Sequence, residues 1–382
     1  MAILGGDDAG GGVTWAPQVI EDAAEHGLIL GENGRLYDSK NGDVLPNGIK
    51  PMPVLSGDVL SRIPEPTAAE FVPRHVARYQ DLMSLAATPG SNQKENFTII
   101  GGGVSESADQ HVHLRDTPGF NIGAAGQPPK CRNSLHVHTT AEVFFVLKGR
   151  WRFFWGRWGT AGEVVLEEGD IINIPTGIFR GFENIGSDYG MIMAILGGGD
   201  AGGGVTWAPQ VIEDAAEHGL ILGENGRLYD SKNGEVLPDG IKPMPVLSSD
   251  VLSRIPEPTA TEFVSRHVAR YQNLMSLAGT QTIQVIGEDG ELKDKPGFSV
   301  DFITRKSSST IQEKFDNSVV LMPMRGYWRL SWNGGNATLN PGDTCLLPAD
   351  FSHSIEPSMS GESSLYRVCS NDDPAGPTWV GN

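Results

Sequence analysis

The stretch His136-Val-His138-Thr-Thr-Ala-Glu142-Val-Phe-Phe-Val-Leu-Lys-Gly149 places two imidazoles and one carboxylate at even-numbered positions. The run around them is rich in strand-forming residues, and successive side chains of a strand point to opposite faces. One continuous strand would therefore put all three groups on one face. Imidazole nitrogen and carboxylate oxygen suit Fe(II), Mn(II), Ni(II), Cu(II) or Zn(II), and three such ligands leave positions open for water or substrate. The pattern predicts a catalytic metal site formed by His136, His138 and Glu142.

Two apolar residues of the same run share the parity of the ligands. Phe144 and Val146 are therefore expected to form the apolar wall of the pocket. The alternative for this segment is that the two histidines line a polar interior and bind no metal.

The spacing His-x-His-x3-Glu-x6-Gly resembles the first motif of the cupin superfamily at every fixed position. The second cupin motif follows as Gly169-Asp-Ile-Ile-Asn-Ile-Pro175-Thr-Gly177-Ile-Phe-Arg180-Gly-Phe-Glu-Asn184. It fits Gly-x5-Pro-x-Gly-x2-His-x3-Asn, except that Arg180 stands where the family has its last metal-ligating histidine. The resemblance implies a β-barrel that holds the metal inside.

Arginine has five donors and no lone pair, so Arg180 cannot replace a histidine as a ligand. Two interpretations remain open. Arg180 could pair with Glu142 or Glu183 and leave no metal site. Alternatively, a fixed cation beside the metal could receive a carboxylate or phenolate of an anionic substrate, and we assign Arg180 this substrate-binding role.

A second barrel follows. The run Gly326-Tyr-Trp328-Arg329-Leu-Ser-Trp332 repeats Gly149-Arg-Trp151-Arg152-Phe-Phe-Trp155 at an offset of 177. The same offset puts Glu313, Phe315 and Val319 where the three ligands stand. His353 ends a second-motif run that begins at Gly342. We therefore expect a bicupin with its metal in the first barrel only.

The segments 1–88 and 193–280 are near-copies at an offset of 192. They differ at Asp7, Asp43, Asn47, Gly57, Ala69, Pro73, Asp81 and Ala87 of the first copy. We predict an N-terminal arm at 1–88, a metal-binding barrel at 89–198, an inter-barrel arm at 199–280 and a metal-free barrel at 281–382. The repeat is either a recent copy of the arm or the result of fusing two close relatives.

Each arm is expected to combine a short hairpin with a helix. Thr67-Ala-Ala-Glu70 is a capping box, and Phe71, Val76, Tyr79, Leu82, Met83 and Leu85 approximate a helical apolar stripe that follows it. Residues 1–6 repeat the strand that closes the first barrel, so we predict that they are disordered or pair with an exposed strand edge.

Composition agrees with a mostly β protein, because 49 glycines and 25 prolines suit short strands joined by many turns. A net charge of −18 argues against nucleic acid and anionic membranes as partners. Cys131, Cys345 and Cys369 do not form a disulfide framework and fit a cytoplasmic location. The sequence contains no apolar run of the length that a membrane span needs.

The fold class expected is all-β, a double cupin of the jelly-roll type with hairpin and helix arms. Among two-barrel cupins this layout is similar to the gentisate-type ring-cleaving dioxygenases. That resemblance implies Fe(II) binding a small aromatic acid and O2. Two other classes stay open: a non-oxygenase metal cupin that is an isomerase, lyase or hydrolase of small organic acids or sugars, and a metal-free small-molecule binding protein. We also expect a homo-oligomer formed through the arm and barrel surfaces.

Overall fold

The structure is a computed structural model that describes residues 20, 24, 27–31, 35–46, 48–51, 65–86, 94–102, 110–197, 205–279, 281–292, 297–306 and 309–370. The prediction for residues 1–6 and part of each predicted arm lie outside the described residues. The chain divides into two compact units, Met1–Glu65 and Pro66–Asn382. Among the described residues, no helix has the length and apolar character needed to cross a membrane.

The first unit contains a hairpin in which β1 (Leu28–Leu30) pairs with β2 (Leu36–Asp38). A 3-10 turn, η1 (Ser39–Asn41), follows the second strand. The Asp38 carboxylate accepts hydrogen bonds from the backbone N–H groups of Lys40 and Asn41, which starts the turn. Gly42 ends it in a left-handed conformation (φ 87°) that glycine adopts without steric cost.

Barrel 1 is built from two sheets of the second unit. The smaller sheet has the order β11-β10-β13-β8-β15, and the larger has the order β18-β12-β9-β14-β7-β5-β4 with β6 paired to β5. The strands are β4 (Ser84–Ala86), β5 (Glu95–Ile100), β6 (Val112–Leu114), β7 (Phe120–Gln127), β8 (His136–Val137), β9 (Glu142–Lys148), β10 (Trp151–Trp155), β11 (Gly162–Leu166), β12 (Ile171–Ile174), β13 (Arg180–Asn184), β14 (Gly190–Gly197), β15 (Thr206–Trp207) and β18 (Val268–Ala269).

Barrel 2 repeats this plan, with sheet orders β19-β20-β27-β22-β25-β3 and β21-β26-β23-β24. Its strands are β3 (Val76–Ala77), β19 (Thr282–Ile286), β20 (Phe298–Lys306), β21 (Ile311–Glu313), β22 (Val319–Arg325), β23 (Trp328–Trp332), β24 (Gly335–Leu339), β25 (Thr344–Leu347), β26 (His353–Pro357) and β27 (Glu362–Ser370). The larger sheets of the two barrels share one apolar core, in which Phe120 meets Phe298 and Phe145 meets Tyr366.

Glycine forms the turn at the end of the first motif. Gly149 joins β9 to β10 with a φ of 92°, which L-residues rarely adopt. A Cβ atom there would also lie 3.2 Å from the Gly190 Cα atom of the neighbouring strand. Glycine at this position therefore lets three strands meet closely.

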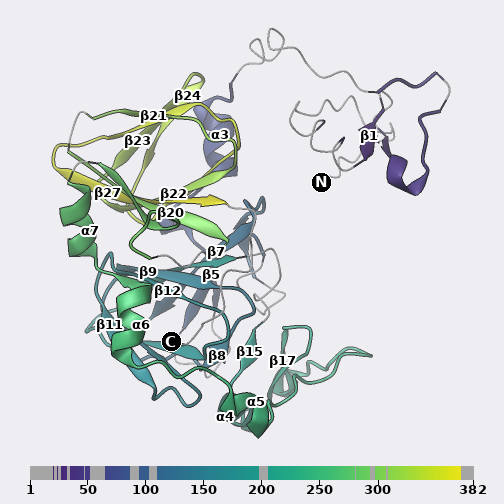
Figure 1. The fold of residues 1–382 in the computed structure, drawn as a ribbon, viewed down its shortest axis with the longest axis vertical. Helices are drawn as coiled ribbons and strands as arrows, with labels where there is room; N and C mark the ends of the chain where they lie inside the picture. The colour runs from purple at the N-terminus through teal and green to yellow at the C-terminus, as the bar shows by residue number, and fades with distance from the viewer. Residues whose placement is uncertain are drawn as a thin grey trace. The chain divides into compact units, whose positions relative to one another are not determined.

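One helix and the short strand after it in each arm copy dock on the barrel that the copy does not precede. Helix α3 (Ala68–His75) of the first copy packs on barrel 2 and α6 (Ala260–His267) of the second copy packs on barrel 1, as Figure 1 shows. Strand β3 pairs with β25 of barrel 2, and β18 pairs with β12 of barrel 1. The contacts are equivalent. Trp332 donates to the Pro66 carbonyl and Trp155 donates to the Pro258 carbonyl.

An ion pair completes each docking contact. Arg78 binds Asp343 at 2.6 Å, and Arg270 binds Asp170 at 2.7 Å. The barrels therefore exchange their arms within one chain. The boundaries of the four predicted segments stay a prediction.

The capping box is confirmed, but the predicted extent of the helix is wrong. The Glu70 carboxylate accepts from the Thr67 backbone N–H at 2.9 Å, yet α3 ends at His75. The next two residues form β3, which pairs with β25 of barrel 2. Ladder hydrogen bonds to another sheet thus replace the next helical turn, which an apolar stripe alone cannot reveal.

Candidate metal centre in the first barrel

The ligand segment is not the single strand that the sequence predicts. His136 lies in β8, His138 lies outside the strands, and Glu142 begins β9. The expectation of one continuous strand is therefore wrong. β8 pairs with β13 and β15 in the smaller sheet, whereas β9 pairs with β12 and β14 in the larger sheet. The chain crosses between the sheets within the motif, and the three side chains meet because both sheets face one interior.

His136, His138 and Glu142 each offer one ligand atom, and these atoms lie within 4.8 Å of one another. All three residues are buried, with 7% to 8% of their surface exposed. Nδ1 of His136 is 2.7 Å from the Ser134 carbonyl oxygen, which can only accept. Nδ1 therefore carries the proton, and Nε2 keeps the lone pair that a metal needs.

The charge state of His136 also suits coordination. Burial, and to a smaller extent the nearby Arg180 guanidinium, lower its pKa to about 3. The imidazole is consequently neutral at neutral pH, as a ligand must be. These observations fit a divalent metal held by two imidazoles and one carboxylate.

Arg180 lies against the carboxylate of the cluster. It begins β13 opposite His136 and is 1% exposed. Its Nη2 atom donates to Glu142 Oε2 at 2.7 Å and its Nε atom to the same oxygen at 3.2 Å. Burial raises the pKa of the Glu142 carboxyl, and the guanidinium opposes that rise. The sequence left open whether Arg180 pairs with Glu142 or with Glu183, and in the structure it pairs with Glu142. Glu183, the other candidate, binds Arg152.

A cavity of about 220 Å³ opens on the cluster. Phe144 lines it, as predicted from its parity, whereas Val146 is fully buried in an apolar core cluster and contributes no wall. The described lining contains no lysine or arginine. It consists of Asn96, Phe97, Thr98, Ala124, Ala125, Asn133, Ser134, His136, His138, Glu142, Phe144, Phe182, Ala194, Leu196, Trp207 and Leu228.

Sequence reasoning missed most of this lining, including two residues that lie outside the predicted barrel. Trp207 and Leu228 belong to the arm that follows barrel 1, far along the chain from the motif. The sequence duplication identifies this arm as a unit, but it does not show which residue of the arm lies opposite His136. Only β15, which places Trp207 opposite His136, reveals the contact.

Comparison with known proteins agrees with this geometry. Residues 126–196 match the model of the family described as "Cupin domain". The chain folds as a two-barrel cupin. No curated protein is significantly similar to it in sequence.

Solved structures resemble the two-barrel cupin over most of its length. Oxalate decarboxylase from Lactobacillus farciminis, in complex with formate, is 11% identical with a TM-score of 0.51, covering 80% of this chain and 88% of that one. Another oxalate decarboxylase structure is 13% identical with a TM-score of 0.51, covering 88% and 89%. A deletion mutant of the Bacillus subtilis oxalate decarboxylase is 12% identical with a TM-score of 0.50, covering 88% of both chains. At these identities the similarity establishes the fold.

The corresponding place in barrel 2 holds an ion-pair network. Glu313 faces His353 in the same strand register that sets His136 opposite Arg180. Arg367 bridges Glu313 and Asp301, and its guanidinium lies 4.7 Å from the centroid of the Phe315 ring. Within the described part of this barrel, no three metal-ligating side chains converge.

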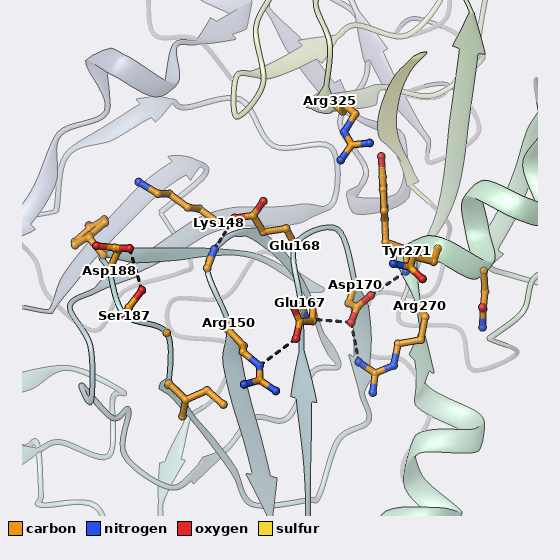
Figure 2. A pocket seen from close by; sticks show the side chains of 16 residues that line it. Lys148, Arg150, Glu167, Glu168, Asp170, Ser187, Asp188, Arg270, Tyr271 and Arg325 are labelled. Carbon is orange, nitrogen blue, oxygen red and sulfur yellow. Dashed lines mark hydrogen bonds and ion pairs between the residues drawn. The ribbon is translucent and has the colours of Figure 1, made fainter. Parts of the chain in front are cut away.

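A larger cavity of about 890 Å³ lies away from the metal ligands (Figure 2). It is lined by the β9–β10 turn, the start of helix α7 (Tyr271–Ala278) and Arg325 of barrel 2. Figure 2 shows two of its basic side chains bound to acidic ones. Arg150 binds Glu167, and Arg270 binds Asp170. The larger cavity contains no group of three converging metal-ligating side chains among the described residues, whereas the smaller one is lined by His136, His138 and Glu142.

Proposed function

We propose that barrel 1 is the active site of a metal-dependent enzyme that acts on a small organic acid by a non-oxidative, lyase-type reaction. The observation that carries the proposal is the convergence of His136, His138 and Glu142 within 4.8 Å at a 220 Å³ cavity. The similarity in fold to oxalate decarboxylases supports decarboxylation as the reaction type.

The charge of the site supports an anionic substrate. A divalent ion, the Glu142 carboxylate and the Arg180 guanidinium together leave an excess of positive charge, because both imidazoles are neutral donors. The described cavity lining has no further acid. Burying unbalanced charge is costly, and a bound carboxylate would restore the balance.

Each side chain has a distinct role in this proposal. His136, His138 and Glu142 would hold the metal, which would act as a Lewis acid toward the carboxylate of the substrate. Arg180 orients Glu142 through two hydrogen bonds and adds positive charge behind it. Anion binding by Arg180 stays a proposal: its Nη1 atom has no hydrogen-bond partner among the described residues, but the residue is not part of the described cavity lining. Phe144 and Phe182 give the cavity apolar walls.

Metal analysis of protein purified without a chelating column tests the proposal. Zinc or manganese near one per chain supports the lyase, iron near one per chain supports the Fe(II) dioxygenase, and the absence of metal supports a binding protein. His138→Gln should lose the metal. His353→Gln, which changes the barrel 2 position corresponding to Arg180, should keep it.

The reaction is then measured with a panel of small carboxylic acids and hydroxybenzoates. Release of CO2 without oxygen uptake is expected. Stoichiometric oxygen uptake would replace the lyase proposal by the dioxygenase. Substrate affinity in metal-loaded Arg180→Ala decides whether the guanidinium contributes to anion binding, and homo-oligomerisation stays a prediction to be checked by sedimentation.

A further inference from the structure

The arm that follows barrel 1 closes one side of the metal cavity. We call residues 205–258 the strap. Its first strand, β15, pairs with β8, so that Trp207 faces His136 and Thr206 faces Val137. The Ala208 backbone N–H donates to the Leu135 carbonyl at 3.0 Å. The strap therefore adds a strand directly beside the one that carries a metal ligand.

Two further contacts hold the strap in place. Ala208 and Leu252 of the strap enter a small apolar cluster with Leu135, Phe154 and Phe179 of barrel 1. The strap hairpin, β16 (Leu220–Leu222) with β17 (Leu228–Asp230), brings Leu228 to the cavity wall. One wall of the site is thus supplied by a segment that follows the predicted barrel in the sequence.

We infer that Trp207 and Leu228 determine which substrates fit, and that the site takes a carboxylate with a compact apolar body of about one ring. The inference rests on the proposed function, because the carboxylate end is assigned to the metal. Most of the residues that form the walls beyond the ligands are apolar, and the others are neutral amides and hydroxyls, with no lysine or arginine among the described lining residues.

Physical chemistry relates these walls to substrate class. A second carboxylate placed among Phe97, Leu196 and Leu228 would lose its hydration without gaining a cation. An aromatic or branched aliphatic body instead buries apolar surface there. Trp207 is half-buried and, being the largest residue of the strap wall, sets the space available to that body.

The test titrates Co(II)-loaded protein with acetate, benzoate and 2-naphthoate and reads dissociation constants from the visible spectrum of the metal. Wild type should bind benzoate more tightly than 2-naphthoate. Trp207→Ala and Leu228→Ala should each raise the affinity for 2-naphthoate relative to benzoate on the order of tenfold, with acetate affinity within about twofold of wild type. Trp207→Phe should fall between wild type and Trp207→Ala.

Leu36→Ala is the matched control, because Leu36 occupies the place of Leu228 in the first arm copy. This variant should leave the ratio of 2-naphthoate to benzoate affinity unchanged. The inference is overturned if both strap variants keep the wild-type ratio of 2-naphthoate to benzoate affinity. It is also overturned if the variants lose cobalt and acetate binding together, which would mean that the strap only supports the barrel.

Failure of the proposed function gives a different result, namely no response of wild-type protein to any carboxylate. The inference about the strap is then decided in metal-free protein from the thermal shifts caused by phenol and 2-naphthol. The inference is supported if phenol stabilises the wild-type protein more than 2-naphthol does and Trp207→Ala and Leu228→Ala reverse this order. It is refuted if wild type shows no such preference or if the variants leave the preference unchanged.

Discussion

Replacing Arg180 by methionine should destabilise the metal-free protein and strengthen metal binding. The guanidinium is 1% exposed, and two of its N–H groups donate to one oxygen of the buried Glu142 carboxylate. Methionine keeps much of the side-chain length but removes the charge. The variant therefore isolates the electrostatic contribution of Arg180 from its packing.

The expected loss follows from burial. Removing one partner of a buried ion pair leaves an uncompensated charge and costs about 3–5 kcal/mol. Arg152→Met on the neighbouring strand β10 is the control, because Arg152 is 32% exposed and pairs with Glu163 and Glu183 at the surface. Exposed pairs of that kind contribute about 0–1 kcal/mol. The two identical substitutions should thus differ by several kcal/mol.

The pH dependence has a definite sign. Burial already raises the pKa of Glu142, and Arg180→Met removes the guanidinium that opposes this rise. A carboxyl whose pKa is higher in the folded state than in the unfolded state favours folding at low pH, and that contribution is lost as pH rises through the folded pKa. The loss of folding stability caused by Arg180→Met should therefore become smaller as the solution is acidified.

Urea unfolding in EDTA, followed by tryptophan fluorescence, measures the loss, and competition with a chromophoric chelator measures metal affinity. A bound ion replaces the missing counter-charge and no longer meets a repelling cation, so Arg180→Met should bind metal at least about tenfold more tightly. The reasoning is refuted if Arg180→Met and Arg152→Met unfold with equal free energies and the metal affinity does not rise.

Three further outcomes are expected. Arg78→Met and Arg270→Met should each lower the free energy of unfolding by about 1–3 kcal/mol, because each removes a charged hydrogen-bond partner from a buried aspartate. Hydrogen exchange should rise in β25 for the first variant and in β12 for the second. Burial lowers the pKa of His267 to about 4, so the folded protein holds this imidazole neutral. The free energy of unfolding should therefore fall by up to about 1.4 kcal/mol per pH unit as pH drops from about 6.5 to 4. His267→Gln should flatten that slope in urea titrations at several pH values. Phe263→Ala should cost about 3–5 kcal/mol in the same assay, since its fully buried ring stacks on Trp155 at 4.2 Å.

Residue chemistry and spacing predicted the ligand types, and the resemblance to the cupin superfamily predicted the barrels. His136, His138 and Glu142 converge as predicted, although the chain between them leaves one sheet and enters the other. The convergence survives this error because a turn between two facing sheets can return the side chains to the shared interior. Spacing thus identified the cluster while misassigning its secondary structure.

The partner of Arg180 and the wall formed by Trp207 could not be derived in the same way. Both depend on which strands lie side by side, which is a long-range property. A guanidinium can pair with any carboxylate within its reach, and the strands select Glu142 for Arg180 while Arg152 takes Glu183. Trp207 becomes a wall only because β15 joins the sheet at β8.

The arm copies separate local from tertiary determinants most directly. Residues 79–86 and 271–278 differ only at Asp81 and Asn273, yet the second copy is the helix α7. The first copy is a 3-10 turn, η2 (Tyr79–Asp81), followed by β4, which pairs with β5 of barrel 1. The sequence by itself determined the capping boxes, the glycine turns and the metal donors, because these depend on neighbours within a few residues. Tertiary structure decided whether the same segment became helix or strand, because the hydrogen bonds offered by an adjacent sheet edge outweigh a small difference in local propensity.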